Sequence, residues 1–161
     1  LDLTHGVRLA VRPIRPEDAP GLMALVDRSS AEDVRLRFRS GLRRLPEAWA
    51  ARLSQIDYDR EMALCAETAE GDILGVARLA SDPEGAEAEF ALMVRSDHQQ
   101  QGLGHALLAR IVDYGATRGL TRICGEVERG NHRMLQVARD LGFKAAPSED
   151  LSLVRVVKSL K

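Results

Sequence analysis

The stretch between residues 89 and 118 constrains the fold of this 161-residue chain more than any other part. A strand-like apolar run ends at Val94, and the loop that follows has glycines at positions 102 and 104 and leads directly into a long amphipathic helical pattern. Glycines let successive N–H groups point into one concavity, and a helix N-terminus adds unpaired donors, so this place suits a phosphate or pyrophosphate. The spacing is neither that of a Walker loop nor that of a dinucleotide fingerprint. A helix that simply begins at a flexible loop is the alternative reading.

The rest of the chain alternates between strand-like and helix-like patterns, with no internal repeat. The pattern predicts one α/β domain over residues 1–161, with a mixed, mostly antiparallel central sheet flanked by helices. We expect strands over 7–14, 62–68, 73–80, 87–94, 123–127 and 151–157, and helices over 16–26, 30–41, 46–56, 102–118 and 131–141.

The composition excludes several classes of protein. Basic and acidic side chains nearly cancel, 23 against 24, although arginine greatly outnumbers lysine, so the net charge does not favour nucleic acid as a partner. No apolar run approaches the ~20 residues of a membrane span. Cys65 and Cys124 lie in apolar segments without metal-ligand spacing, which predicts buried thiols, a cytoplasmic location and no metal. Because the chain begins at Leu1 and not at Met, we expect it to be a domain cut from a larger protein.

Two motifs in fixed order resemble the GCN5-related N-acetyltransferases, the GNAT family. The pattern Gln99-x-x-Gly102-x-Gly104 after an apolar strand resembles that family's pyrophosphate loop. Asn131, at the start of a helix that ends in Leu-Gly-Phe, resembles its second element on the coenzyme side. Residues 55–64, 75–79 and 88–91 further resemble the acetyltransferase domain of bacterial Pat-type protein lysine acetyltransferases. That domain is commonly fused to an acyl-CoA-synthetase-like domain, which would explain the start at Leu1.

The resemblance implies a GNAT fold and acetyl-CoA as cosubstrate. The pyrophosphate would lie on the N–H groups of the loop, and the pantetheine arm would pair with the preceding strand like an additional strand. Asn131 would bind the pantetheine amide, and Arg95 and Arg133 are further candidates to contact the polyanionic coenzyme. The implied binding residues are Leu92, Met93, Val94, Gln99, Gln100, Gln101, Gly102, Leu103, Gly104, His105 and Asn131.

Acetyl transfer to a lysine requires a base, because a free ε-ammonium has a pKa of about 10.4. Glu87 and Glu89 share one face of the predicted strand, and the Pat-type resemblance places the catalytic glutamate at Glu89. A backbone N–H near Met93 would stabilise the oxyanion. Many members of the family carry a tyrosine that protonates the leaving thiolate, whereas this chain has Ala138 at the matching position. Tyr58 and Tyr114 are the alternatives, and both are better interpreted as structural.

Taken together, these residues predict an acetyl-CoA-dependent protein Nε-lysine acetyltransferase with direct transfer, acting on acyl-CoA synthetases. A small-molecule amine N-acetyltransferase and a non-catalytic acyl-CoA-sensing module are the alternatives. The basic run of Arg35, Arg37, Arg39, Arg43 and Arg44 is either a solvated face or a docking surface for an acidic protein, because this region flanks the acceptor side in the family. The acidic loop of Asp57, Asp59 and Glu61 could attract the target lysine.

Overall fold

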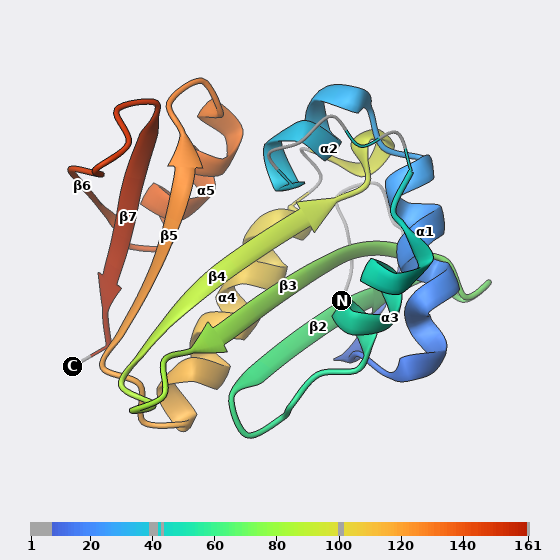
Figure 1. Ribbon diagram of the computed structural model, residues 1–161, viewed down its shortest axis with the longest axis horizontal. Coiled ribbons are helices and arrows are strands. Elements are labelled where there is room, and N and C mark those ends of the chain that lie inside the picture. The colour runs from blue at the N-terminus through green and yellow to red at the C-terminus, as the bar shows by residue number, and fades with distance from the viewer. Residues whose placement is uncertain (1–7, 39–41, 43, 100–101, 161) are drawn as a thin grey trace.

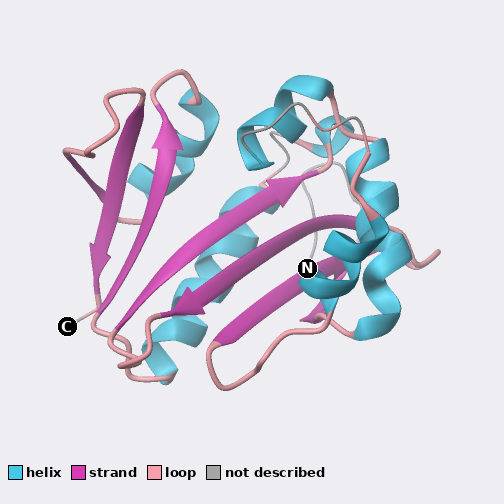
Figure 2. Ribbon diagram, viewed as in Figure 1, coloured by secondary structure: helices cyan, strands magenta, loops and turns pink. Residues whose placement is uncertain are grey.

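The computed structural model describes residues 8–38, 42, 44–99 and 102–160. Within them, seven strands form one mixed sheet in the order β1-β2-β3-β4-β5-β7-β6, with helices on both faces (Figures 1 and 2). The strands are β1 (Ala10–Pro13), β2 (Glu61–Glu67), β3 (Ile73–Ser81), β4 (Glu87–Val94), β5 (Arg122–Glu128), β6 (Lys144–Ala146) and β7 (Leu153–Ser159). The α-helices are α1 (Ala19–Asp27), α2 (Ala31–Phe38), α3 (Glu47–Ser54), α4 (Leu103–Thr117) and α5 (His132–Asp140), with 3₁₀ turns at Pro16–Asp18 and Ser96–His98.

The centre of the sheet is interrupted between β4 and β5. Strands β1 to β4 form an antiparallel meander, and β5 pairs antiparallel with β7. Strand β4 pairs with β5 in parallel, but only where Glu87–Glu89 face Arg122–Cys124. Beyond Glu89 the two strands diverge, as Figure 1 shows, so that the upper half of β4 lies apart from β5. This divergence positions the candidate site.

Two hydrophobic cores hold the helices against the sheet. On one face, α4 and α5 pack on residues such as Leu79, Phe90 and Leu92, whereas α1, α2 and α3 pack on the other face against Ala63, Val76 and Met93 among others. Helix α4 approaches the sheet closely at Gly75, where an added Cβ would lie 2.8 Å from Leu107 Cδ1. Because side chains alternate along β4, one face of this strand is covered by α4 and the other carries Glu89.

The expected α/β architecture is confirmed, with small differences at the ends of elements. The first predicted helix begins as a 3₁₀ turn, because Pro16 and the buried Asp18 shape its start. The three-residue strand β6 was not predicted, since its mostly exposed residues carry no alternating pattern. Cys65 and Cys124 are buried free thiols, and burial raises their pKa values to about 12 and about 11. None of the helices within the described residues has the length and apolar character needed to cross a membrane.

Candidate functional site

A cleft of about 540 Å³ opens where β4 and β5 diverge. Its two walls are residues 89–94 of β4 and residues 126–128 of β5, and residues of α2, of the loop before α4 and of α5 complete its lining. Among the binding and catalytic residues predicted from sequence, those that line it are Glu89, Leu92, Met93, Val94, Gln99, Gly102, Gly104, His105, Asn131 and Arg133. Leu103 lies beneath the loop and is only 1% exposed, and Gln100 and Gln101 lie outside the described residues.

The upper half of β4 offers its main chain to the cleft. From Phe90 to Val94 no described residue of β5 pairs with this edge, although the other edge of β4 is fully paired with β3. Buried side chains on both faces, including Leu92 and Met93, anchor the strand. The result is a rigid strand edge whose N–H and C=O groups can accept an extended ligand.

The two glycines predicted to shape the loop before α4 differ in how far their positions require glycine. Gly102 is the residue before the helix and has a φ of +87°, a left-handed conformation that favours glycine. Gly104 does not need to be glycine for packing, because an added Cβ would make ordinary contacts with Leu92 and Val94 at 3.6 and 3.8 Å. The first N–H groups of α4 have no acceptor within the helix, so they form a donor set at the positive end of its dipole.

One side chain caps α5 at this end of the cleft, and another joins α5 to α4. The amide oxygen of Asn131 caps α5 by accepting from the N–H of Met134 at 3.2 Å, which leaves the NH₂ group as a hydrogen-bond donor. His105 Nε2 and Asp140 Oδ2 are 2.8 Å apart and join α4 to α5. The hydrogen bond from His105 is the main cause that lowers the pKa of Asp140. The side chain of His105 therefore has a structural contact.

Glu87 and Glu89, which point to the same side of β4, have different surroundings. Glu87 accepts hydrogen bonds from Arg122 at 2.7 Å and Arg155 at 2.9 Å, and the bond from Arg122 is the main cause that lowers its pKa. Glu89 is exposed at the closed end of the cleft, opposite Cys124, and no described residue donates a hydrogen bond to it. Of the two glutamates, Glu89 is thus the one that no described arginine holds in an ion pair.

The β5 wall adds two carboxylates that the sequence analysis missed. Glu126 accepts from Ser148 Oγ at 2.8 Å, and Glu128 accepts from Arg35 at 3.0 Å. Glu128 Oε2 is buried and has no hydrogen-bond partner among the described residues. Both glutamates lie at alternate positions from Cys124, so the period of two along β5 was the signal that could have found them.

Several other predicted residues lie away from the cleft or are bound elsewhere. Neither predicted tyrosine is among the described residues that line it: Tyr58 donates to the carbonyl of Ile14, and Tyr114 packs on the core. Ala138 is buried. Arg95 pairs with Asp97, and Arg133, which does line the cleft, pairs there with Asp33.

The predicted charged segments contribute unequally. In the basic run, Arg35 and Arg37 belong to α2, Arg37 lines the cleft, Arg44 is exposed, and Arg39 and Arg43 lie outside the described residues. The acidic loop at residues 57–61 does not line the cleft. The part of the chain that the structure describes holds no group of three or more His, Cys, Asp or Glu side chains arranged for a metal ion.

The cleft fits a ligand that is extended along one part and anionic at one end. The unpaired edge of β4 suits the extended part, and the α4 N-terminus suits the anionic part. Between the two lies Gln99, whose Oε1 is buried without a partner among the described residues, while its Nε2 donates to the carbonyl of Val94 at 3.2 Å. Such an unsatisfied buried acceptor indicates a ligand donor at this point.

Comparison with known proteins gives a consistent result. The family profile described as an acetyltransferase (GNAT) domain matches residues 8–144. An acetyltransferase of Pseudomonas aeruginosa is 27% identical over 144 residues, which cover 88% of this chain and 77% of that protein.

Solved structures agree with the sequence match. The GNAT domain of S. lividans Pat superposes with a TM-score of 0.92 at 28% identity, covering 99% of this chain and 94% of that one. A spermidine N-acetyltransferase from Vibrio cholerae, solved with CoA and spermine, has a TM-score of 0.78 at 19% identity, covering 94% and 95% of the two chains, and thus shares the fold.

Proposed function

Since the chain belongs to the GNAT family of acetyltransferases, whose cosubstrate is acetyl-CoA, we propose that it is a protein Nε-lysine acetyltransferase that transfers the acetyl group directly. The observation that carries this proposal is the position of Glu89, an unpaired carboxylate among the described residues at the closed end of a cleft with a free strand edge. The similarity to the GNAT domain of a Pat protein supports the lysine specificity.

The binding roles follow from the geometry of the cleft. The β4 main chain at Leu92, Met93 and Val94 would pair with the pantetheine arm, and the first N–H groups of α4, after Gly102, would hold the pyrophosphate. The NH₂ group of Asn131 would donate to a pantetheine carbonyl. When bound, acetyl-CoA supplies an acetyl group activated as a thioester.

The protein's own contribution to the chemistry is a base and a hydrogen-bond donor. Glu89 accepts the proton of the incoming lysine ammonium, directly or through one water, so that the amine is neutral when it attacks. The main chain near Met93 offers an N–H to the oxygen on which negative charge develops. Because the described lining residues include no tyrosine, no phenol is assigned as the acid for the leaving thiolate.

The carboxylates of the cleft support a cationic acceptor. Glu89, Glu126 and Glu128 line the cleft, but Glu126 is paired with Arg155 at 3.8 Å and Glu128 with Arg35 at 3.0 Å, so Glu89 is the carboxylate left to attract an ammonium group. Such a group is present both in a protein lysine and in a small polyamine, so acetylation of a small amine is the second candidate function. We propose an acyl-CoA synthetase in the cytoplasm as the protein acceptor, and a synthetase-like domain as the natural fusion partner of this chain.

A competition between acceptors tests the function. The chain is incubated with acetyl-CoA and an intact acyl-CoA synthetase, a peptide from that protein, or spermine, and kcat/KM is measured for each. We expect the intact protein to be the best acceptor by at least tenfold, and Glu87→Gln to behave as the matched control for Glu89→Gln. A higher kcat/KM for spermine would replace the proposal with small-amine acetylation. Coenzyme binding without turnover on any acceptor would favour a sensing module.

A further inference from the structure

We propose that Asp33 is a positioning residue that links helix α2 to the coenzyme side of the cleft, so that coenzyme binding orders the acceptor side. This inference rests on the proposed coenzyme site but on no particular acceptor. Asp33 lies in the first turn of α2, where an acidic side chain ordinarily complements the helix dipole. In the structure it has a different and larger set of contacts.

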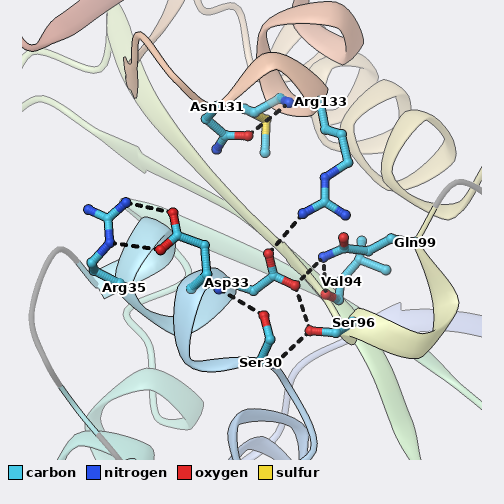
Figure 3. A network of polar contacts seen from close by, with 10 residues as sticks. Ser30, Asp33, Arg35, Val94, Ser96, Gln99, Asn131 and Arg133 are labelled. Carbon is cyan, nitrogen blue, oxygen red and sulfur yellow. Dashed lines mark hydrogen bonds and ion pairs between the residues drawn. The ribbon is translucent and has the colours of Figure 1, made fainter.

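The Asp33 carboxylate is largely shielded from solvent, and both of its oxygens accept hydrogen bonds. Its side chain is 10% exposed, and it accepts hydrogen bonds from three side chains of two segments, the loop after β4 and the start of α5 (Figure 3). Ser96 Oγ and Gln99 Nε2 donate to Oδ2 at 2.5 and 2.9 Å, and Arg133 donates to Oδ1 at 2.9 Å. A buried carboxylate requires such compensation, because burying an unpaired charge costs several kcal/mol.

Each of these three donors belongs to the coenzyme side. Ser96 follows the end of β4, and Gln99 belongs to the predicted pyrophosphate loop and also donates to the carbonyl of Val94. Arg133 lies in the first turn of α5, two residues after Asn131. The segments that would hold the coenzyme therefore meet on one carboxylate.

Helix α2 itself lies on the acceptor side. It covers the same face of the sheet as Glu89, and Asp33 and Leu36 of α2 line the cleft. Two further contacts hold α2 in place. The N–H of Ser30, just before α2, donates to Ser96 Oγ at 2.7 Å, and Arg35 of α2 pairs with Glu128 of β5 at 3.0 Å. Asp33 is thus the point where the acceptor helix and the coenzyme segments share hydrogen bonds.

The consequence is a thermodynamic linkage between the two sides. A coenzyme that fixes Gln99 and Arg133 also fixes the donors of Asp33, which restricts α2. By reciprocity, an α2 held in place favours coenzyme binding by the same factor. Removing the charge of Asp33 should therefore weaken coenzyme binding and also abolish the effect of coenzyme on α2.

Coenzyme A itself is the probe, and two quantities are measured on the whole chain: its dissociation constant by calorimetry, and hydrogen–deuterium exchange over residues 31–38. In the native chain we expect coenzyme A to slow exchange in α2. In Asp33→Asn we expect the dissociation constant to rise about tenfold, and the coenzyme-dependent protection of α2 to disappear. The control is Asp27→Asn, which removes one exposed charge from α1 and should change neither quantity.

Unchanged affinity together with unchanged protection in Asp33→Asn would overturn the inference. If that variant does not fold, as judged by circular dichroism, Ser96→Ala decides: it removes one donor to Asp33 at a residue that does not line the cleft. Full coenzyme-dependent protection of α2 in Ser96→Ala would likewise overturn it. A native chain that does not bind coenzyme A would instead contradict the proposed function, so the two failures are distinguishable.

Discussion

At the residue scale, the surroundings of a side chain decide the chemistry of the cleft more than its type does. Glu87 and Glu89 are identical side chains two positions apart, yet two arginines hold Glu87 as a carboxylate whose pKa is lowered. Those arginines are 35 and 68 positions away in the sequence, so no local pattern could reveal the difference. Glu89 was predicted as the base through the family resemblance. The physical reason to prefer it is that two arginines hold Glu87, whereas no described residue donates a hydrogen bond to Glu89.

The left-handed conformation of Gly102 allows a matched test of the coenzyme loop. Gly102→Asp and Gly71→Asp both force an aspartate into φ values near +90°, and neither new Cβ meets an atom within 4 Å. Each substitution should cost about 1–2 kcal/mol of unfolding free energy through backbone strain. Only Gly102→Asp also places a negative charge where phosphates would bind, so calorimetry should show a loss of coenzyme A affinity for that variant alone. Equal affinities for both variants would show that the loop does not hold the phosphates.

Some residues of the site could be predicted and others could not, for identifiable reasons. Gly102 and Asn131 belong to short local motifs, because a loop and a helix cap are built from neighbours in sequence. The role of Asp33 depends on donors 63 to 100 positions away, so its sequence context shows only a first-turn acidic residue. Glu128 was overlooked because the predicted strand ended at residue 127, and Glu126 because only the divergence of β4 from β5 places it in a cleft.

At the element scale, a partly buried network of charges joins β1 to the start of α1. Arg12 donates to Asp18 at 2.7 and 2.8 Å and to Glu67 of β2 at 2.7 Å. The N–H of Arg15 also donates to Asp18. The hydrogen bond from Arg12 is the main cause that lowers the pKa of Asp18, although burial opposes it. This first helix was predicted from its proline and acidic residues, but the network that anchors it was not.

The lowered pKa makes a signed prediction about stability and pH. Because Asp18 has a lower pKa in the folded chain than in the unfolded chain, its contribution is complete above the unfolded value of about 3.9 and is lost as the pH falls further. Asp18→Asn should lower the unfolding free energy by about 2 kcal/mol at pH 7, a difference that shrinks below pH ~4. Urea unfolding at several pH values measures this, with the exposed Glu17→Gln as the control. A constant difference down to pH 2 would contradict the assigned role.

Most elements were predictable because the spacing of apolar residues shows which face of a helix or strand is buried. The exceptions have physical causes. The strands of the meander alternate or are wholly apolar, and α4 has an apolar face that packs on the sheet. The divergence of β4 from β5 was implied only by the family, since it depends on tertiary packing. At that point the Phe90 ring lies against Gly125, where an added Cβ would approach it to 2.4 Å. The Phe90 ring therefore occupies the space that a side chain at position 125 would fill, at the point where β4 and β5 diverge.

At the scale of the whole molecule, coenzyme binding should stabilise the fold, because the cleft is lined by both strand walls and by helices from both faces of the sheet. At a concentration of 100 times its dissociation constant, a ligand that binds only the folded state adds about 2.7 kcal/mol. For a domain of this size that should raise Tm by about 5–10 °C. Thermal unfolding with and without coenzyme A measures the shift, and Gly102→Asp should reduce it. The absence of any shift in the native chain would argue against the coenzyme site.

The central claim is that this cleft acetylates a protein lysine with Glu89 as the base. Mass spectrometry of an intact acyl-CoA synthetase, incubated with acetyl-CoA and equal amounts of the native chain, Glu87→Gln or Glu89→Gln, tests it most directly. We expect the native chain and Glu87→Gln to acetylate the same lysine at rates within a few-fold, and Glu89→Gln to be slower by about 10²-fold or more. Acetylation by Glu89→Gln at the native rate, or no acetylated lysine with any of the three, would contradict the claim.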